Sequence, residues 1–402
     1  MKKIGIVAAL CLGIFASQGT LSAAEIDFSG SVGVEARAFV HSPSHAGQLT
    51  GVQPSLILES ELLWESDNGD HQIFLNPWGR IDARDNERSH LDLREAYYAW
   101  SGGDWRVRLG LGRVFWGVTE SRHLVDIINQ TDLVENIDEE DKLGQPMVEI
   151  STLQDFGEVR FYVLPGFRER TFPGPDGRFR GPLVIDTDNA RYDSAAKNHR
   201  VDFAARYSNY FGDWDVGVSF FNGTSREPRF LPSATPGRLI PFYDVITQAG
   251  LDVQYTSDAW LWKFEGIFRS GQSDDFGAIV AGLEYTFYGV TTSGVDLGML
   301  VEYLYDGRNS NPSLAPPTLT DNDVFVGSRY ALNDIQDTQI LAGGIVDIDN
   351  GSTAALVEAS RRFGENWIAE IEARIFLNVD SADLLASFAD DDSLTLRVTR
   401  YF

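Results

Sequence analysis

The residues best suited to act on a solute are arginines and carboxylates that alternate with apolar residues along short segments. If these charges faced each other across a water-filled space, they would create a transverse field that orients dipolar or charged solutes. If they paired along one wall, they would only stiffen that wall. No ring of a single sign emerges, so the sequence predicts no preference for anions or cations. The candidate residues are Arg37, Arg80, Arg94, Arg106, Arg108, Arg160, Arg200, Arg206, Glu59 and Glu61.

Sequence motifs for catalysis, metal binding or cofactor binding are weak or absent. Among six scattered histidines, only His41 and His45 share a ligand-pair spacing, and they lie in a Pro-Ser loop. The sequence contains no Gly-x-Ser-x-Gly elbow and no phosphate-binding glycine loop. The acidic runs 138–141 and 390–392 lack the alternating spacing of a Ca²⁺ loop, which favours solvated loop acids. We therefore expect no catalytic residue, no metal site and no cofactor.

The N-terminus has the features of a secretory signal peptide. Lys2 and Lys3 precede an apolar run, and the small residues Ser22-Ala23-Ala24 follow it. Cleavage after residue 24 would remove both lysines and change the net charge from -26 to -28. It would also remove Cys11, the one cysteine, which excludes disulfides and thiolate metal sites in the mature chain. Such an acidic chain is not expected to bind nucleic acid.

The segments that carry these charges have the sequence pattern of β-strands. Alternation of apolar and polar residues is clear in 28–40, 260–268, 295–305 and 367–377, over about ten residues each. Beyond the signal peptide, no apolar run approaches the ~20 residues of a membrane helix. About eighteen such segments follow one another, although sixteen is also compatible with the pattern. A soluble all-β secreted protein stays open as an alternative, because alternation alone does not exclude it.

The connections between these segments alternate in length. Short turns, such as 66–70, 101–104 and 364–366, are flanked by aromatic residues, as in the interfacial girdles of membrane barrels. The intervening connections include all the long ones: 117–145, 167–196, 225–242, 306–322 and 379–391. This asymmetry predicts an all-β fold, a single transmembrane antiparallel β-barrel of residues 25–402 with short periplasmic turns and long extracellular loops.

The last segment, Leu394–Phe402, resembles the C-terminal assembly signal of outer-membrane proteins. Leu394, Leu396 and Val398 alternate toward the final Phe402, while Arg400 departs from the usual aromatic. The resemblance implies that the barrel-assembly machinery is a partner that binds this strand.

The connection 117–145 is unusually apolar for a surface loop. Leu124, Ile127, Ile128, Leu133 and Val134 have roughly helical spacing. Apolar residues on a solvated loop need a surface to pack on, and the barrel wall offers one. The pattern allows two interpretations: a loop that folds into the lumen as a constriction, or a helix on the outer rim. The first interpretation places Asp126, Asn129, Asp132 and Glu135 at the constriction.

The same region carries a family resemblance. The sequences Leu91-Asp-Leu-Arg-Glu-Ala-Tyr, Arg108–Ser121 and Asp126–Asp132, followed by Pro146, look like a segment of the porin-like outer-membrane β-barrel family of proteobacteria. Most members of this family have no assigned substrate. The family pattern has Asn-Pro where this chain has Asn129-Gln130. In general porins the loop after the fifth strand folds inward, so the resemblance implies the same role for residues 117–145.

Together these features predict an outer-membrane porin for passive diffusion of small polar or amphipathic solutes. Expected partners are membrane lipid, lipopolysaccharide and the small solute, and a homo-oligomer is possible. A plugged structural, adhesion or binding barrel is the first alternative. An outer-membrane hydrolase is the second alternative, although no motif in the sequence marks a catalytic nucleophile.

Overall fold

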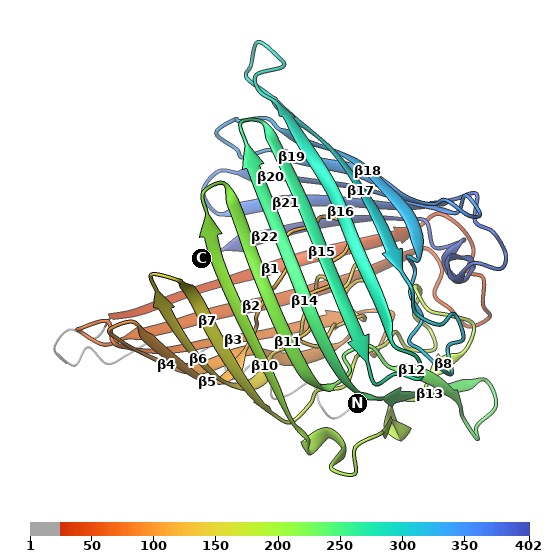
Figure 1. Cartoon of the computed structure of the whole chain (residues 1–402). Helices are drawn as coiled ribbons and strands as arrows, with labels where there is room; N and C mark the ends of the chain where they lie inside the picture. Colours follow the sequence, from red (N-terminus) through yellow and green to blue (C-terminus); the bar gives the residue numbers. More distant parts are fainter. Residues whose placement is uncertain (1–24) are drawn as a thin grey trace, which may run out of the picture.

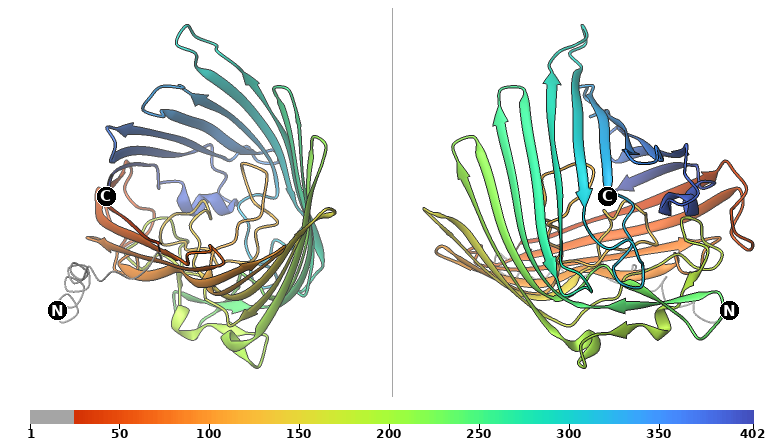
Figure 2. Two further views of the ribbon diagram at one scale, coloured as in Figure 1. Left: turned by 90° about the vertical axis from the view of Figure 1, so that its left-hand side faces the viewer. Right: turned by 45° about the vertical axis from the view of Figure 1, so that its right-hand side comes forward.

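A computed structural model describes residues 25–402, and the predicted signal peptide lies outside this range. Eighteen antiparallel strands follow one another around a single closed β-barrel (Figures 1 and 2). The strands are β1 (Glu25–Phe39), β2 (Val52–Glu65), β3 (His71–Asp82), β4 (His90–Gly102), β5 (Trp105–Gly112), β6 (Gln145–Gln154), β7 (Gly157–Pro165), β10 (Val201–Phe211), β11 (Trp214–Thr224), β14 (Val245–Ser257), β15 (Trp260–Ser270), β16 (Phe276–Phe287), β17 (Asp296–Asp306), β18 (Asn322–Ala331), β19 (Gln339–Asp347), β20 (Thr353–Phe363), β21 (Trp367–Leu377) and β22 (Ser393–Tyr401). The predicted fold class and the count of eighteen are confirmed.

The barrel closes where the first strand meets the last. β1 pairs with β22 in a register that runs from Ser31 opposite Tyr401 to Phe39 opposite Ser393. Beyond this ladder, Gly30 and Phe402 exchange both backbone hydrogen bonds, each at 3.0 Å. Closure leaves no unpaired edge, which is the condition for a sheet to cross a layer that contains no water.

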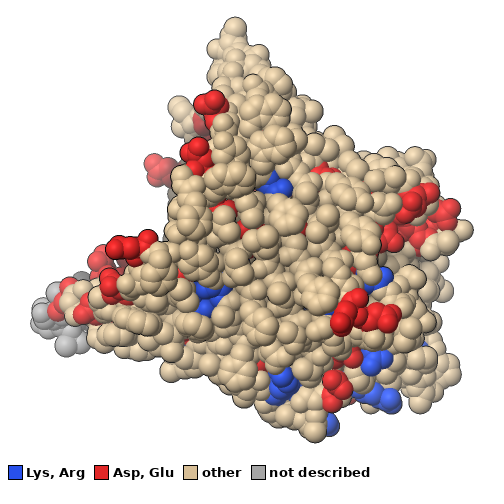
Figure 3. All heavy atoms as spheres, in the orientation of Figure 1, with Lys and Arg blue, Asp and Glu red and all other residues tan. Residues whose placement is uncertain are grey.

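The two faces of each strand differ as the alternation predicts. On β1, Val32 and Val34 are 36% and 59% exposed on the outside, whereas Glu35 between Val34 and Ala36 is fully buried inside. Over the strands, the face in Figure 3 carries few charged side chains, and Asp and Glu gather toward its edges. An apolar outside and a charged inside fit a wall between lipid and a polar lumen.

Connection length also follows the prediction. Even-numbered strands of the barrel end in turns as short as 103–104 and 155–156, and the connections after odd-numbered strands include 113–144, 166–200 and 378–392. None of the helices within residues 25–402 is long and apolar enough to cross a membrane.

Two connections predicted as plain loops contain strands of their own. β8 (Val184–Ile185), β9 (Arg191–Tyr192), β12 (Arg229–Pro232) and β13 (Arg238–Tyr243) form a small separate sheet, and η2 (Thr187–Asn189) and η3 (Lys197–His199) lie beside it. β13 pairs in parallel with β8 and β9, which belong to a different connection. Such pairing between loops leaves no local periodicity, so it could not be seen in the sequence. A further 3₁₀ helix, η4 (Leu384–Phe388), lies in the last long connection.

Candidate site in the barrel interior

Residues 113–144, here called the interior segment, pack against the inner wall of the barrel. Val125 and Ile128 are fully buried in a cluster that includes Ile246, Ile267 and Leu300 on β14, β15 and β17. The helical spacing of residues 124–134 is misleading, because these residues form turns and no helix. Their apolar side chains meet the inward-facing side chains of the strands, so burial fixes the path of the chain without helical hydrogen bonds.

Two wall carboxylates hold the first part of this segment. Glu265 on β15 accepts hydrogen bonds from the backbone N–H groups of Val118 (2.7 Å), Thr119 (3.1 Å) and Val125 (3.2 Å). Glu302 on β17 accepts from the N–H groups of Glu120 and Ser121, both at 2.8 Å. Irregular backbone inside a barrel needs partners for its N–H groups, and these carboxylates supply them.

Glycine and asparagine allow the segment to leave and rejoin the wall. Gly117 has a φ of +150°, and a β-carbon there would lie 3.0 Å from Oε1 of Glu265. A β-carbon at Gly144 would overlap the backbone carbonyl oxygen of Arg94. Asn129 ties the two ends together, since it accepts from Val114 N and donates to the carbonyls of Gly112 and Leu143.

The far part of the interior segment contacts the opposite side of the barrel. Asp132 is fully buried against Arg94 (2.8 Å) and His90 (3.3 Å) of β4. Burial acts to raise the pKa of Asp132, but the hydrogen bond from His90 and the charge of Arg94 outweigh it and lower that pKa to about 2. Glu135 bonds the Arg80 guanidinium of β3 at 2.6 Å. The segment therefore bridges β15 and β17 to β3 and β4.

His90, Asp132 and Glu135 are close enough together to suggest a metal site, with one ligand atom from each within 4.8 Å of the others. Each carboxylate already forms an ion pair with an arginine, however: Asp132 with Arg94 and Glu135 with Arg80. A cation placed there would face two guanidinium groups. The donor set does not fit a metal, and the group acts as an ion-pair network.

This network continues to the seam of the barrel. Glu35 on β1 is fully buried and accepts from Arg80, Arg88 and Arg397, each within 2.8 Å. Arg397 belongs to β22, so the carboxylate spans the pairing of the first and last strands. Alternation predicted that Glu35 faces inward, but nothing in its spacing identified three arginine partners.

The predicted pore-lining residues lie in several different surroundings. Arg106 and Glu61 are exposed, and Arg37 is buried against Thr395 and the carbonyl of Glu135. Most of the others pair with acids on the wall or on the interior segment. These pairs are Arg80–Glu35, Arg94–Asp132, Arg108–Glu149, Arg160–Glu158, Arg200–Asp202 and Arg206–Asp252. Glu59 instead accepts a hydrogen bond from the Asn76 amide. The loop carboxylates touch their arginines directly, which favours paired wall charges over a field across an open gap.

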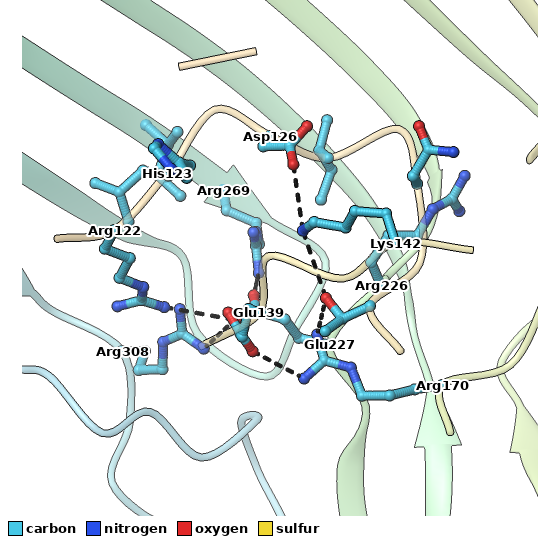
Figure 4. Close-up of a pocket in the computed structure, with 15 residues that line it drawn as sticks. Arg122, His123, Asp126, Glu139, Lys142, Arg170, Arg226, Glu227, Arg269 and Arg308 are labelled. Atoms are coloured by element: carbon cyan, nitrogen blue, oxygen red, sulfur yellow. Dashed lines mark hydrogen bonds and ion pairs between the residues drawn. The ribbon is translucent and has the colours of Figure 1, made fainter. Parts of the chain in front are cut away.

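A second charged group was missed in the sequence. Glu227, in the connection after β11, lies beside Arg122, Arg269 and Arg308, and Asp126 of the interior segment lies nearby with Lys142 at 3.2 Å (Figure 4). Burial raises the pKa of Asp126 against the influence of Lys142. These residues come from separate connections and strand ends, and no local motif links them.

Porin barrels have about 16 to 18 strands and enclose an aqueous channel, so the closed barrel of eighteen strands falls within their size range. Among solved structures, the chain is similar to OccK8 (OprE) of Pseudomonas aeruginosa, with a TM-score of 0.53, 10% identity and coverage of 94% of this chain and 98% of that one. It also matches a mutant of the Rh. blastica porin, with a TM-score of 0.46, 12% identity and coverage of 94% and 100%. No family model and no curated protein matches the sequence. At such low identity the first likeness establishes the fold.

Proposed function

We propose that the chain is a channel of the outer membrane through which small polar or amphipathic solutes diffuse passively, with residues 117–145 narrowing the passage. The observation that carries this proposal is the interior segment itself. It is held at Glu265 and Glu302 on one side and at Arg80 and Arg94 on the other. A barrel built only for adhesion has no need of a segment fixed across its interior. The porin architecture of OccK8 supports the same reading.

Planar-bilayer recording tests the proposal. The purified chain should give stepwise conductance in KCl, and a variant lacking residues 120–140 should give larger steps because the constriction is gone. A variant shortened at the hairpin tip 233–237, between β12 and β13, serves as a control for loss of loop mass. Absence of conductance in every salt and voltage condition would refute the channel.

One observation favours the alternative of a plugged binding barrel. Arg178 is buried and bonds Asp391 at 2.5 Å, and it also bonds the carbonyls of His41 and Leu49. It thereby joins three connections at the long-loop end, where Phe39, Phe179 and Leu385 form a second apolar cluster. If this end is sealed, Arg178→Ala should open a conductance that the unaltered protein lacks.

A further inference from the structure

Three arginines surround the carboxylate of Glu227 in a hollow beside the interior segment (Figure 4). Arg269, at the end of β15, bonds Oε2. Arg308, in the connection after β17, donates to Oε1 at 3.2 Å, and Arg122 of the interior segment lies 3.5 Å from the same oxygen. We call these four residues the Glu227 cage. Four separate parts of the chain must meet to form it.

The hollow carries an excess of positive charge. Six arginine and lysine side chains, His123 and three carboxylates line it, in a chain whose net charge is -26. Arg226, Arg269 and Arg308 have almost no exposed surface, so solvent screens their charges poorly. Two further carboxylates outside the hollow offset part of this charge, since Asp306 pairs with Arg308 and Arg122, and Asp202 pairs with Arg226 at 3.1 Å. The surroundings nevertheless favour an anion over a cation or a neutral group.

Glu227 shows which anion the cage fits. Burial acts to raise its pKa, but Arg308, Arg269 and Arg122 outweigh burial and hold that pKa well below its usual range. Guanidinium groups approach both carboxylate oxygens, an arrangement that matches the planar shape of a carboxylate. The side chain is 14% exposed, and the cavity beside it has a volume of only about 40 Å³. The carboxylate group of a small acid can therefore enter the cage only by displacing Glu227, while the rest of the acid stays at the mouth of the hollow.

We propose that the Glu227 cage binds the carboxylate group of a passing solute, and that Glu227 is a tethered competitor that fills the site between solutes. This inference rests on the proposed channel function and adds a solute class to it, small carboxylic acids in their anionic form. Exchange of one carboxylate for another keeps every arginine paired. A neutral solute offers no such exchange, because displacing Glu227 would leave the buried guanidinium group of Arg269 without a carboxylate partner, whereas Arg308 and Arg122 keep Asp306.

Benzoate and benzamide, which share shape and differ in charge, test the site. Titration calorimetry on the detergent-solubilised full chain should show binding of benzoate and weaker or no binding of benzamide. Glu227→Gln should tighten benzoate binding about tenfold, because it removes a charge-assisted hydrogen-bonding competitor worth about 1.5 kcal/mol. Arg269→Gln should abolish the preference for benzoate. Glu284→Gln is the matched control, since it removes a lumen carboxylate of β16 outside the hollow.

The outcomes separate the site from the channel. Equal binding of benzoate and benzamide by the unaltered protein, or weaker benzoate binding by Glu227→Gln, would overturn the site, and the first of these requires no variant to fold. Equal tightening by Glu284→Gln would also overturn it, because general charge would then explain the effect. Benzoate binding in a protein without conductance would refute the channel and leave the site standing. Conductance in a protein that binds benzoate and benzamide equally would refute the site and leave the channel standing.

Discussion

Replacing Glu265 by alanine should release the first part of the interior segment from the wall. The carboxylate accepts three backbone N–H groups, from Val118, Thr119 and Val125, and the Thr119 hydroxyl at 2.7 Å. Alanine would leave these donors without their acceptor. The cost is about 1 kcal/mol or more for each buried N–H, so the held state should lose about 3 kcal/mol or more.

A loss of about 3 kcal/mol corresponds to a roughly hundredfold larger population of the released state. Hydrogen exchange read by mass spectrometry should therefore speed up about a hundredfold at residues 118–125. Glu265→Gln should have a smaller effect, since its carbonyl oxygen can keep the donors that share Oε1. In a bilayer, Glu265→Ala should raise the open-channel noise.

Glu284→Ala is the control for this experiment, because Glu284 lies on the neighbouring strand and accepts none of the N–H groups of the segment. It should leave exchange at residues 118–125 unchanged. Unchanged protection in Glu265→Ala would refute the reasoning, as would equal effects of the glutamine and alanine variants.

Three further predictions concern other parts of the barrel. Glu35→Gln should cost about 3 kcal/mol, because Arg80, Arg88 and Arg397 each lose a charged partner, although Arg80 keeps Glu135 and Arg88 keeps Asp82. The loss should lower the temperature of the heat-dependent gel shift, and an unchanged shift would contradict this. Burial would lower the pKa of His123, but Glu140 and Glu265 raise it from 6.5 to about 9. The charged imidazole should therefore stabilise the segment below about pH 6.5 and lose this effect as pH rises through 9; noise in His123→Gln should not follow pH. Deleting Phe402 removes both bonds to Gly30 and should lower the yield of assembled barrel in membrane fractions, whereas equal yield would argue against an assembly role.

The wall of the barrel could be predicted from local residue patterns. In β1, Val34 and Glu35 take opposite faces because side chains alternate along a strand, and lipid tolerates only the apolar one. The number of alternating segments then predicted about eighteen strands, and the alternation of short and long connections supported this, because each hairpin returns the chain to the same end. Both patterns depend only on residues that are close together in the sequence, so they can be recognised without knowing which residues lie across the lumen.

The contents of the barrel depend on contacts between residues that are far apart in the sequence. The spacing of Leu124, Ile127 and Ile128 predicted a helix as readily as a wall-packed loop, and only contacts with strands far along the chain selected the loop. The partners in the Glu227 cage are similarly remote, with Arg308 lying 81 residues after Glu227 in sequence. Ion pairs and buried contacts depend on distance in space. Where the barrel brings distant connections together, these contacts produce no periodic pattern in the sequence.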